Sequence, residues 1–275
     1  MSRDFFPMIP LVQILTKRSS SSWRNFSESD WKIESYCEGW RPKDIVSHLV
    51  TGTEFYTASI EHAMKDLEPV PPYGKNVKEF FSIRDEKGRQ LMQLSHDVLL
   101  DRFDELSNNL QKQIDKINSE NSKQLGFHPR GSMPLEFWIG QRLFEIVLHD
   151  WDIRYGQDSS SFLSPEGVKG ILPFLPMQIC RLFNFREKIP FRGSFLFTSE
   201  NPKRKWIIVV SDEKAEENYD LKSDVDVKIE ADSESLILLL FGRSNTKEIE
   251  QENKLKILGD RQMAFKLLDI LSTKY

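Results

Sequence analysis

Glu145 and His149 lie one helical turn apart in the stretch RLFEIVLHDWDIR, residues 142–154. On a helix, side chains four positions apart bring their Cβ atoms to about 5–6 Å, so this carboxylate and this imidazole can face the same point. Such a pair often makes only a surface hydrogen bond or a weak ion pair. The neighbouring residues are largely apolar, which predicts a buried helix, and a buried carboxylate needs a partner or a metal ion.

A metal site needs a third ligand, and the five histidines of the chain restrict the choice. His48 lies in the apolar-flanked sequence DIVSHLV, where the alternative role is that of a hydrogen-bonded core histidine. His62 follows on the same predicted helix, about 21 Å away along its axis, so only one of the two can reach a given ion. His96 lies at an expected helix boundary and His128 in a polar loop, which makes both weaker candidates.

The elements that carry these residues are predicted by a helical periodicity over residues 8–156. Helices are expected from about residue 8, and over residues 42–68, 76–94, 97–118 and 134–155. Pro42 and Asp44 suit the first turn of their helix. One apolar stripe is formed by Leu99, Phe103, Leu106, Leu110, Ile114 and Ile117. Long amphipathic helices joined by loops predict an all-α four-helix bundle over residues 1–157.

Residues 158–275 have a different pattern, which predicts a smaller α+β domain. Strands are expected over residues 193–199, 205–212 and 225–232, with the charged segment 211–224 between the last two. Helices are expected near residue 164, interrupted at Pro173 and Pro176, then over 233–243, and over 260–272. Ser233 or Ser235 is the expected N-cap of the second of these helices.

The net charge, the cysteine count and the length of the apolar runs indicate which partners and which cellular compartment to expect. The net charge of −4, without a basic stripe, argues against nucleic acid. Two distant cysteines, Cys37 and Cys180, fit a reducing cytoplasm. No segment approaches the roughly 20 consecutive apolar residues of a membrane span. We therefore expect a cytoplasmic protein without a nucleic-acid or membrane partner, and both a monomer and a homodimer are compatible with the sequence.

Two stretches resemble signatures of the mycothiol-dependent maleylpyruvate isomerase family, part of the wider DinB-like superfamily. The first is WKIESYCEGWRPKDIVSHLV, residues 31–50, and the second is RLFEIVLHDWD, residues 142–152. The matching residues are Trp31, Ser35, Cys37, Gly39, Trp40, Asp44, His48 and Leu49 in the first, and Arg142, Glu145, His149 and Asp152 in the second. Residues 190–275 resemble the sterol-carrier-protein-like domain (SCP2-like) that follows the bundle in this family, through the strand around Trp206 and the sequence LILLLFGR.

The resemblance implies a divalent metal, with zinc as the first expectation, held by His48, Glu145 and His149. Two imidazoles and one carboxylate are a known catalytic zinc set, which leaves the fourth position to water or substrate. The resemblance also implies a low-molecular-weight thiol such as mycothiol as cosubstrate, beside a small-molecule substrate. A metal deprotonates a coordinating thiol, and the thiolate can isomerise an activated double bond or displace a leaving group. The ligand set does not distinguish this isomerase or thiol S-transferase from a hydrolase that activates water.

Several other polar residues have two possible roles each. Asp152 is expected to accept the free N–H of a ligand imidazole and support catalysis, or else to be a surface carboxylate. Arg142 is expected to orient Glu145 or pair with it. Arg243, at the end of LILLLFGR, is the expected catalytic and cofactor-binding residue of the second domain. It would bind an anionic group of the substrate or thiol. The alternative is an arginine that faces the dipole of a helix end. Cys37 is interpreted as a packing cysteine.

Two non-enzymatic functions remain alternatives at this point. One is a metal-binding protein without catalysis on the same scaffold. The other is a carrier of a lipid-like ligand in the C-terminal domain.

Overall fold

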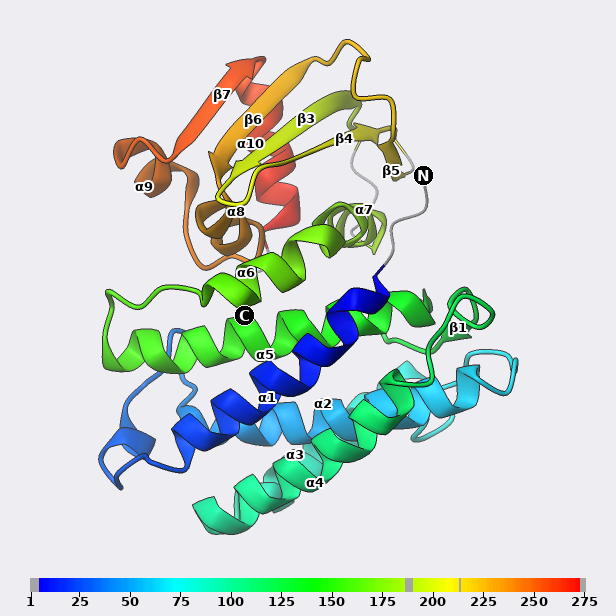
Figure 1. The fold of residues 1–275 in the computed structure, drawn as a ribbon, viewed down its shortest axis with the longest axis vertical. Coiled ribbons are helices and arrows are strands. Elements are labelled where there is room, and N and C mark those ends of the chain that lie inside the picture. The colour runs from blue at the N-terminus through cyan, green and yellow to red at the C-terminus, as the bar shows by residue number, and fades with distance from the viewer. Residues whose placement is uncertain (1–4, 186–189, 213, 273–275) are drawn as a thin grey trace. The chain divides into compact units, whose positions relative to one another are not determined.

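The computed structural model describes residues 5–185, 190–212 and 214–272 (Figure 1). The chain divides into two compact units, one up to Gly170 and one from Ile171. The first is helical and the second contains a five-stranded sheet with helices. The predicted fold class, a helical domain followed by an α+β domain, is confirmed.

The helical unit is built around four helices that form a closed ring of neighbours. Helices α1 and α2 each pack against both α4 and α5, and α3 lies against α2. Their bounds are α1 (Ile9–Trp23), α2 (Pro42–Ala63), α3 (Val77–Leu91), α4 (His96–Ile114) and α5 (Leu135–Gln157). A short pair of strands, β1 (Leu125–Gly126) and β2 (Met133–Pro134), lies in the expected polar loop before α5.

The start of α2 follows the sequence signals. Pro42 occupies the first turn, and the Asp44 carboxylate accepts a hydrogen bond from the backbone N–H of Arg41 at 2.9 Å. The helix ends at Ala63, five residues before the expected end at residue 68. In α4, the predicted apolar stripe is buried, with Leu106 only half-buried.

Helix α5 is buried on nearly every side, as its apolar sequence predicts. Its polar side chains are therefore buried as well, among them Gln141, Arg142, His149 and Asp152. Because buried polar groups need partners, the structure around α5 must supply them, and this requirement determines the candidate site.

The end of the helical unit lies beyond the expected boundary at residues 157 and 158. Helix α6 (Pro165–Ile171) follows α5 after a loop, and its Glu166 pairs with Arg18 of α1 at 3.2 Å. The backbone of Gly167 lies so close to Val147 of α5 that an added Cβ would meet its side chain at 2.8 Å. Most of α6 therefore belongs to the helical unit.

The second unit contains a mixed sheet in the order β5-β4-β3-β6-β7. Its strands are β3 (Gly193–Glu200), β4 (Arg204–Val210), β5 (Ala215–Asn218), β6 (Val227–Asp232) and β7 (Leu255–Gly259). Strand β3 is antiparallel to β4 and parallel to β6. The three predicted strands are β3, β4 and β6. The sequence analysis missed β5, which lies within the charged segment, and β7, because charged residues at edge strands hide the apolar alternation.

Helices α7 (Leu175–Phe185), α8 (Ser233–Leu240) and α10 (Arg261–Leu271) contact the sheet, and α9 (Thr246–Gln251) packs against β7. The expected interruption near Pro173 is confirmed, since a 3-10 turn over Leu172–Phe174 separates α6 from α7. The expected N-cap of α8 is wrong: the side chain of Asp232 accepts the hydrogen bond from the backbone N–H of Ser235 at 2.9 Å. Within the described residues, no helix is both long and apolar enough to cross a membrane.

Candidate metal centre

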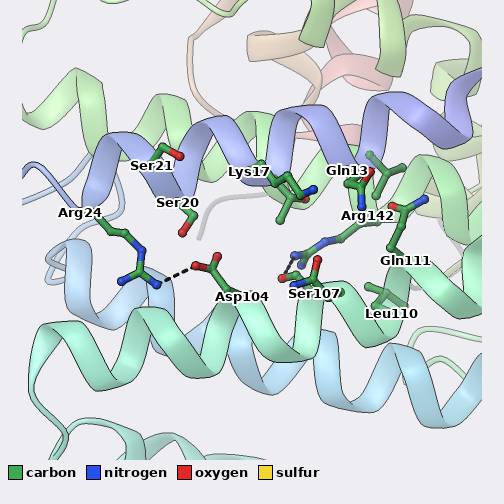
Figure 2. Close-up of a pocket in the computed structure, with 13 residues that line it drawn as sticks. Gln13, Lys17, Ser20, Ser21, Arg24, Asp104, Ser107, Leu110, Gln111 and Arg142 are labelled. Carbon is green, nitrogen blue, oxygen red and sulfur yellow. Dashed lines mark hydrogen bonds and ion pairs between the residues drawn. The ribbon is translucent and has the colours of Figure 1, made fainter.

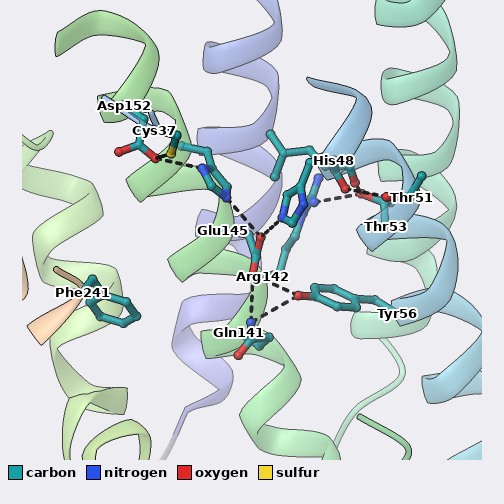
Figure 3. Close-up of polar contacts among 12 residues, drawn as sticks. Cys37, His48, Thr51, Thr53, Tyr56, Gln141, Arg142, Glu145, Asp152 and Phe241 are labelled. Carbon is teal, nitrogen blue, oxygen red and sulfur yellow. Dashed lines mark hydrogen bonds and ion pairs between the residues drawn. The ribbon is translucent and has the colours of Figure 1, made fainter. Parts of the chain in front are cut away.

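His48, Glu145 and His149 converge in the helical unit, and Figure 3 shows the His48 ring beside the Glu145 carboxylate. Helix α2 supplies the first and α5 the other two. The Glu145 Oε2 atom lies 3.2 Å from His48 Nε2 and 3.6 Å from His149 Nε2. Donor atoms around a tetrahedral zinc, with bonds of about 2.0–2.1 Å, lie about 3.4 Å apart. The Glu145 oxygen therefore has the spacing from both imidazole nitrogens that one such ion requires, and all three ligand atoms lie within 4.8 Å of one another.

The second oxygen of Glu145 is held by two donors. The hydroxyl of Tyr56 and the amide nitrogen of Gln141 donate to Oε1 at 3.2 and 3.0 Å. The same amide also donates to the Tyr56 hydroxyl, at 3.2 Å (Figure 3). With Oε1 occupied in this way, Oε2 is the oxygen left to face the two imidazoles. The sequence analysis missed both residues, although Gln141 stands four positions before Glu145 and spacing alone could have indicated it.

The other ring nitrogen of His149 is held by Asp152. Its Nδ1 lies 2.8 Å from Asp152 Oδ2, and the Asp152 side chain is fully buried. A carboxylate on one ring nitrogen fixes the ring and directs the other nitrogen toward a metal. The expected contact between this carboxylate and a candidate ligand is present, and the alternative of a surface carboxylate is wrong.

Cys37 is buried, as expected for a packing cysteine, and it also contacts the site. Its Sγ donates to Asp152 Oδ2 at 3.3 Å. Cys37, His149 and Asp152 thus form a second group of metal-ligating types. All three are buried, and both donors already converge on one carboxylate oxygen, which is a satisfied hydrogen-bonded arrangement. The group therefore supports the first site rather than forming a second one.

Arg84 of α3 determines the tautomer of His48. Its Nη2 lies 3.3 Å from His48 Nδ1, and its Nε donates to the hydroxyl of Thr51 at 3.2 Å. Because a guanidinium only donates, Nδ1 accepts and Nε2 carries the proton that faces Glu145. A cation at Nε2 would replace that proton and require Nδ1–H, so Arg84 would have to turn away from the ring. The donor set fits a metal, for which the Arg84 contact and the His48–Glu145 hydrogen bond would both have to give way.

Burial and charge set the protonation of the site. Burial, assisted by the charges of Arg84 and His149 and opposed by Glu145, lowers the pKa of His48 to about 4. Burial alone would raise the pKa of Glu145, but the hydrogen bond from His48 and the neighbouring cationic groups outweigh it and hold this pKa well below its usual range. Burial raises the pKa of the Tyr56 hydroxyl, which stays a donor. A neutral imidazole and an ionised carboxylate are the forms that bind metals.

A pocket of about 450 Å³ opens beside His48 and is lined by Trp40, Phe81, Arg84, Arg89 and Met92, among others. The Trp40 ring lies 5.2 Å from the His48 ring and 6.4 Å from the His149 ring, between centroids. The His48 and Glu145 side chains keep 21% and 16% exposure, whereas His149 keeps 2%. A small molecule can therefore approach from the His48 side.

The remaining histidines lie in other surroundings. His62 contacts the carbonyl of Glu68 at 2.8 Å. His96 stacks on Trp31, with centroids 4.3 Å apart. His128 Nδ1 accepts a hydrogen bond from a backbone N–H at 3.0 Å. None of the three belongs to a ligand group among the described residues.

The two arginines singled out in the sequence behave differently from each other. Arg142 neither pairs with Glu145 nor orients it through a hydrogen bond within the described residues: its guanidinium donates to Thr53 and Ser107 at 2.8 and 3.0 Å. That expectation is wrong, because the side chain extends toward α2 and α4. Arg243 is buried in the α+β unit and donates to the carbonyl of Phe241, just beyond α8, at 3.0 Å. This contact is typical of an arginine at a helix end, and its anion-binding role stays a prediction.

Comparison with known families adds a second line of evidence. Residues 12–154 match the family described as "Mycothiol maleylpyruvate isomerase N-terminal domain". The chain belongs to this family. Residues 189–272 match the SCP-2 sterol transfer family. The mycothiol maleylpyruvate isomerase match spans the whole candidate site, from the Cys37 region to Asp152.

Two solved structures share this architecture. A mycothiol-dependent maleylpyruvate isomerase mutant has a TM-score of 0.62 at 13% identity, covering 93% of each chain. A second structure of a mycothiol-dependent maleylpyruvate isomerase has a TM-score of 0.61 at 14% identity, covering 89% of this chain and 91% of the other. At such identities the likeness shows the fold. No curated protein sequence matches this chain.

Proposed function

We propose that the protein is a metal-dependent enzyme that uses a low-molecular-weight thiol. The thiol would either catalyse isomerisation of a small electrophilic substrate or be transferred onto that substrate. The observation that carries the proposal is the convergence of His48, Glu145 and His149, with ligand atoms within 4.8 Å of one another, beside an open pocket. The family match supports the thiol, of which mycothiol is the first candidate, and the donor set favours zinc.

The residues would divide the work as follows. His48, Glu145 and His149 would hold the ion, which when bound supplies a positive charge that deprotonates a coordinating thiol. Tyr56 and Gln141 hold the Glu145 carboxylate in place, and Asp152 holds the His149 ring. Both contacts reduce the reorganisation that binding requires.

The pocket suggests the substrate class. Arg84 and Arg89 line it together with the rings of Trp40 and Phe81 and the carboxylates of Asp44 and Asp85. Because Arg89 also bonds Glu86 at 2.6 Å, Arg84 is the guanidinium proposed to meet the substrate. Guanidinium groups recognise carboxylates by paired hydrogen bonds, and the aromatic rings exclude water from an apolar segment. An unsaturated carboxylic acid suits this lining. Arg243 of the α+β unit is proposed to bind an anionic group of the substrate or thiol.

The test is a pair of variants on one helix. His48→Ala is expected to lose stoichiometric zinc, measured by elemental analysis, and thiol-dependent turnover of a panel of α,β-unsaturated acids. His62→Ala, on the same helix but bonded to a loop carbonyl, is the matched control and should keep both. Full metal content in His48→Ala would contradict the site.

A second set of outcomes separates the enzyme from its alternatives. Metal bound by the wild type without thiol-dependent turnover would contradict the enzyme and favour a metal-binding protein. Turnover that needs water but no thiol would indicate a hydrolase. Lipid found by mass spectrometry in the purified protein, without turnover, would favour the carrier.

A further inference from the structure

A groove between α1 and α4 lies apart from the candidate metal pocket. It has a volume of about 230 Å³, and its lining includes Thr16, Lys17 and Ser20 of α1, and Gln111 of α4. Arg142 of α5 reaches into its lining, and Figure 2 shows its guanidinium beside Ser107. The groove thus brings a buried charge close to water.

Arg142 is a buried cation without a carboxylate. The residue is 1% exposed, and its two hydrogen bonds go to the hydroxyls of Thr53 and Ser107. Within the described residues it has no ion-pair partner. Burial lowers the pKa of its guanidinium to about 10, so it remains charged at neutral pH. Buried charges are usually paired with an opposite charge, whereas this one bonds only neutral hydroxyls, and the charge of the Glu145 carboxylate acts on it without a direct hydrogen bond.

Three buried polar atoms of the same lining also have no hydrogen-bond partner in the described part of the chain. They are Thr16 Oγ1, Ser20 Oγ and Gln111 Oε1. The two hydroxyls can donate to an anion. The Gln111 amide nitrogen donates to Asp115 at 2.7 Å, which fixes the orientation of the amide. The amide atom without a partner is therefore the oxygen, which is an acceptor. A ligand that satisfies all three must accept hydrogen bonds and also donate one, which a small oxyanion does through an O–H.

The remaining charges of the groove favour an anion. Arg24 bonds the carboxylates of Asp104 and Asp101 at 2.7 and 2.8 Å, and Figure 2 shows the contact with Asp104. Lys17 is exposed at the rim and has no ion-pair partner among the described residues. Lys17 and Arg142 are therefore the positively charged residues of the lining that bond no carboxylate within the described residues.

We propose that the groove between α1 and α4 is a second binding site, which takes a small oxyanion that bears a hydroxyl, such as monohydrogen phosphate, with Arg142 as its counter-ion. Neither the metal ligands nor the pocket beside His48 takes part. The proposal is independent of the catalytic function.

The test is calorimetric titration of the full chain with inorganic phosphate, sodium sulfate and glycerol 3-phosphate. We expect one phosphate per chain and at least about tenfold weaker binding of sulfate, which has no O–H for Gln111 at neutral pH. Glycerol 3-phosphate, whose phosphate group is mostly a dianion without an O–H at neutral pH, is expected to bind about as weakly as sulfate, and binding comparable to that of inorganic phosphate would contradict the hydroxyl requirement. The absence of saturable phosphate binding would overturn the proposal, and equal binding of sulfate would overturn the hydroxyl requirement.

Variants locate the bound ion. Thr16→Val and Ser20→Ala remove hydroxyls that bond nothing in the described part of the chain, so the fold should persist while phosphate binding weakens about tenfold. Lys17→Gln should weaken it severalfold. Ser22→Ala on α1 and Lys112→Gln on α4, both exposed and outside the lining, are the matched controls. His48→Ala should bind phosphate unchanged; loss of binding there, or unchanged binding in the three groove variants, would contradict the site.

Discussion

Arg142 and Glu145 are charged residues one turn apart on α5, the first buried and the second partly exposed, and their surroundings differ. The Glu145 carboxylate has hydrogen bonds from Tyr56, Gln141 and His48. The Arg142 guanidinium has two hydroxyls and no carboxylate within the described residues. One charge lies in a polar network with two imidazoles, whereas the other lies beside a groove with atoms that have no partner among the described residues. One buried helix can therefore direct its charged side chains toward two separate sets of polar partners.

The largest expected effect is on the carboxylate side. Glu145→Gln keeps an acceptor for Tyr56 and Gln141 but removes the negative charge between the imidazoles. We expect zinc affinity to fall by about a thousandfold or more, because one of three ligands becomes a neutral amide. Competition with a chromophoric chelator measures this.

Glu136→Gln is the control on the same helix. It breaks a contact of the partly buried Glu136 with Lys123 and should leave zinc affinity unchanged. Equal zinc affinity in Glu145→Gln and the wild type would mean that the ion, if bound, is held elsewhere.

The second effect concerns the arginine side. Arg142→Ala leaves a cavity and removes the partner of two buried hydroxyls, which we expect to cost about 3 kcal/mol of unfolding free energy. Arg142→Met fills most of the space without a buried charge and should cost about 1 kcal/mol. Urea denaturation measures both. A methionine variant as unstable as the alanine variant would show that the charge itself stabilises the fold, contrary to the picture of a cation that bonds only neutral hydroxyls.

The smallest effect concerns the support of His149. Asp152→Asn weakens the acceptor for the ring N–H, and we expect zinc affinity to fall about 10- to 100-fold. Asp150→Asn changes a neighbouring carboxylate that pairs with Arg154 at 2.9 Å and serves as control. If both variants bound zinc equally, Asp152 would stabilise packing around Cys37 rather than the ligand ring.

Much of the fold could be predicted from local signals. The Pro42 start of α2, the apolar stripe of α4 and the interruption near Pro173 depend on neighbouring residues in the sequence and were correct. The edge strands β5 and β7 were missed, because pairing with a neighbouring strand, rather than their own sequence, makes them strands.

The same distinction between local sequence signals and tertiary contacts applies to the candidate site. By itself, the sequence determined that Glu145 and His149 share one side of a helix, since a spacing of four residues fixes that geometry. Only the tertiary structure decided that His48 meets them, that Tyr56 holds the carboxylate, and that Arg142 extends to α2 and α4 instead. Those contacts depend on which helices pack together and how each is rotated about its axis, and such rotations follow from the packing of the whole core.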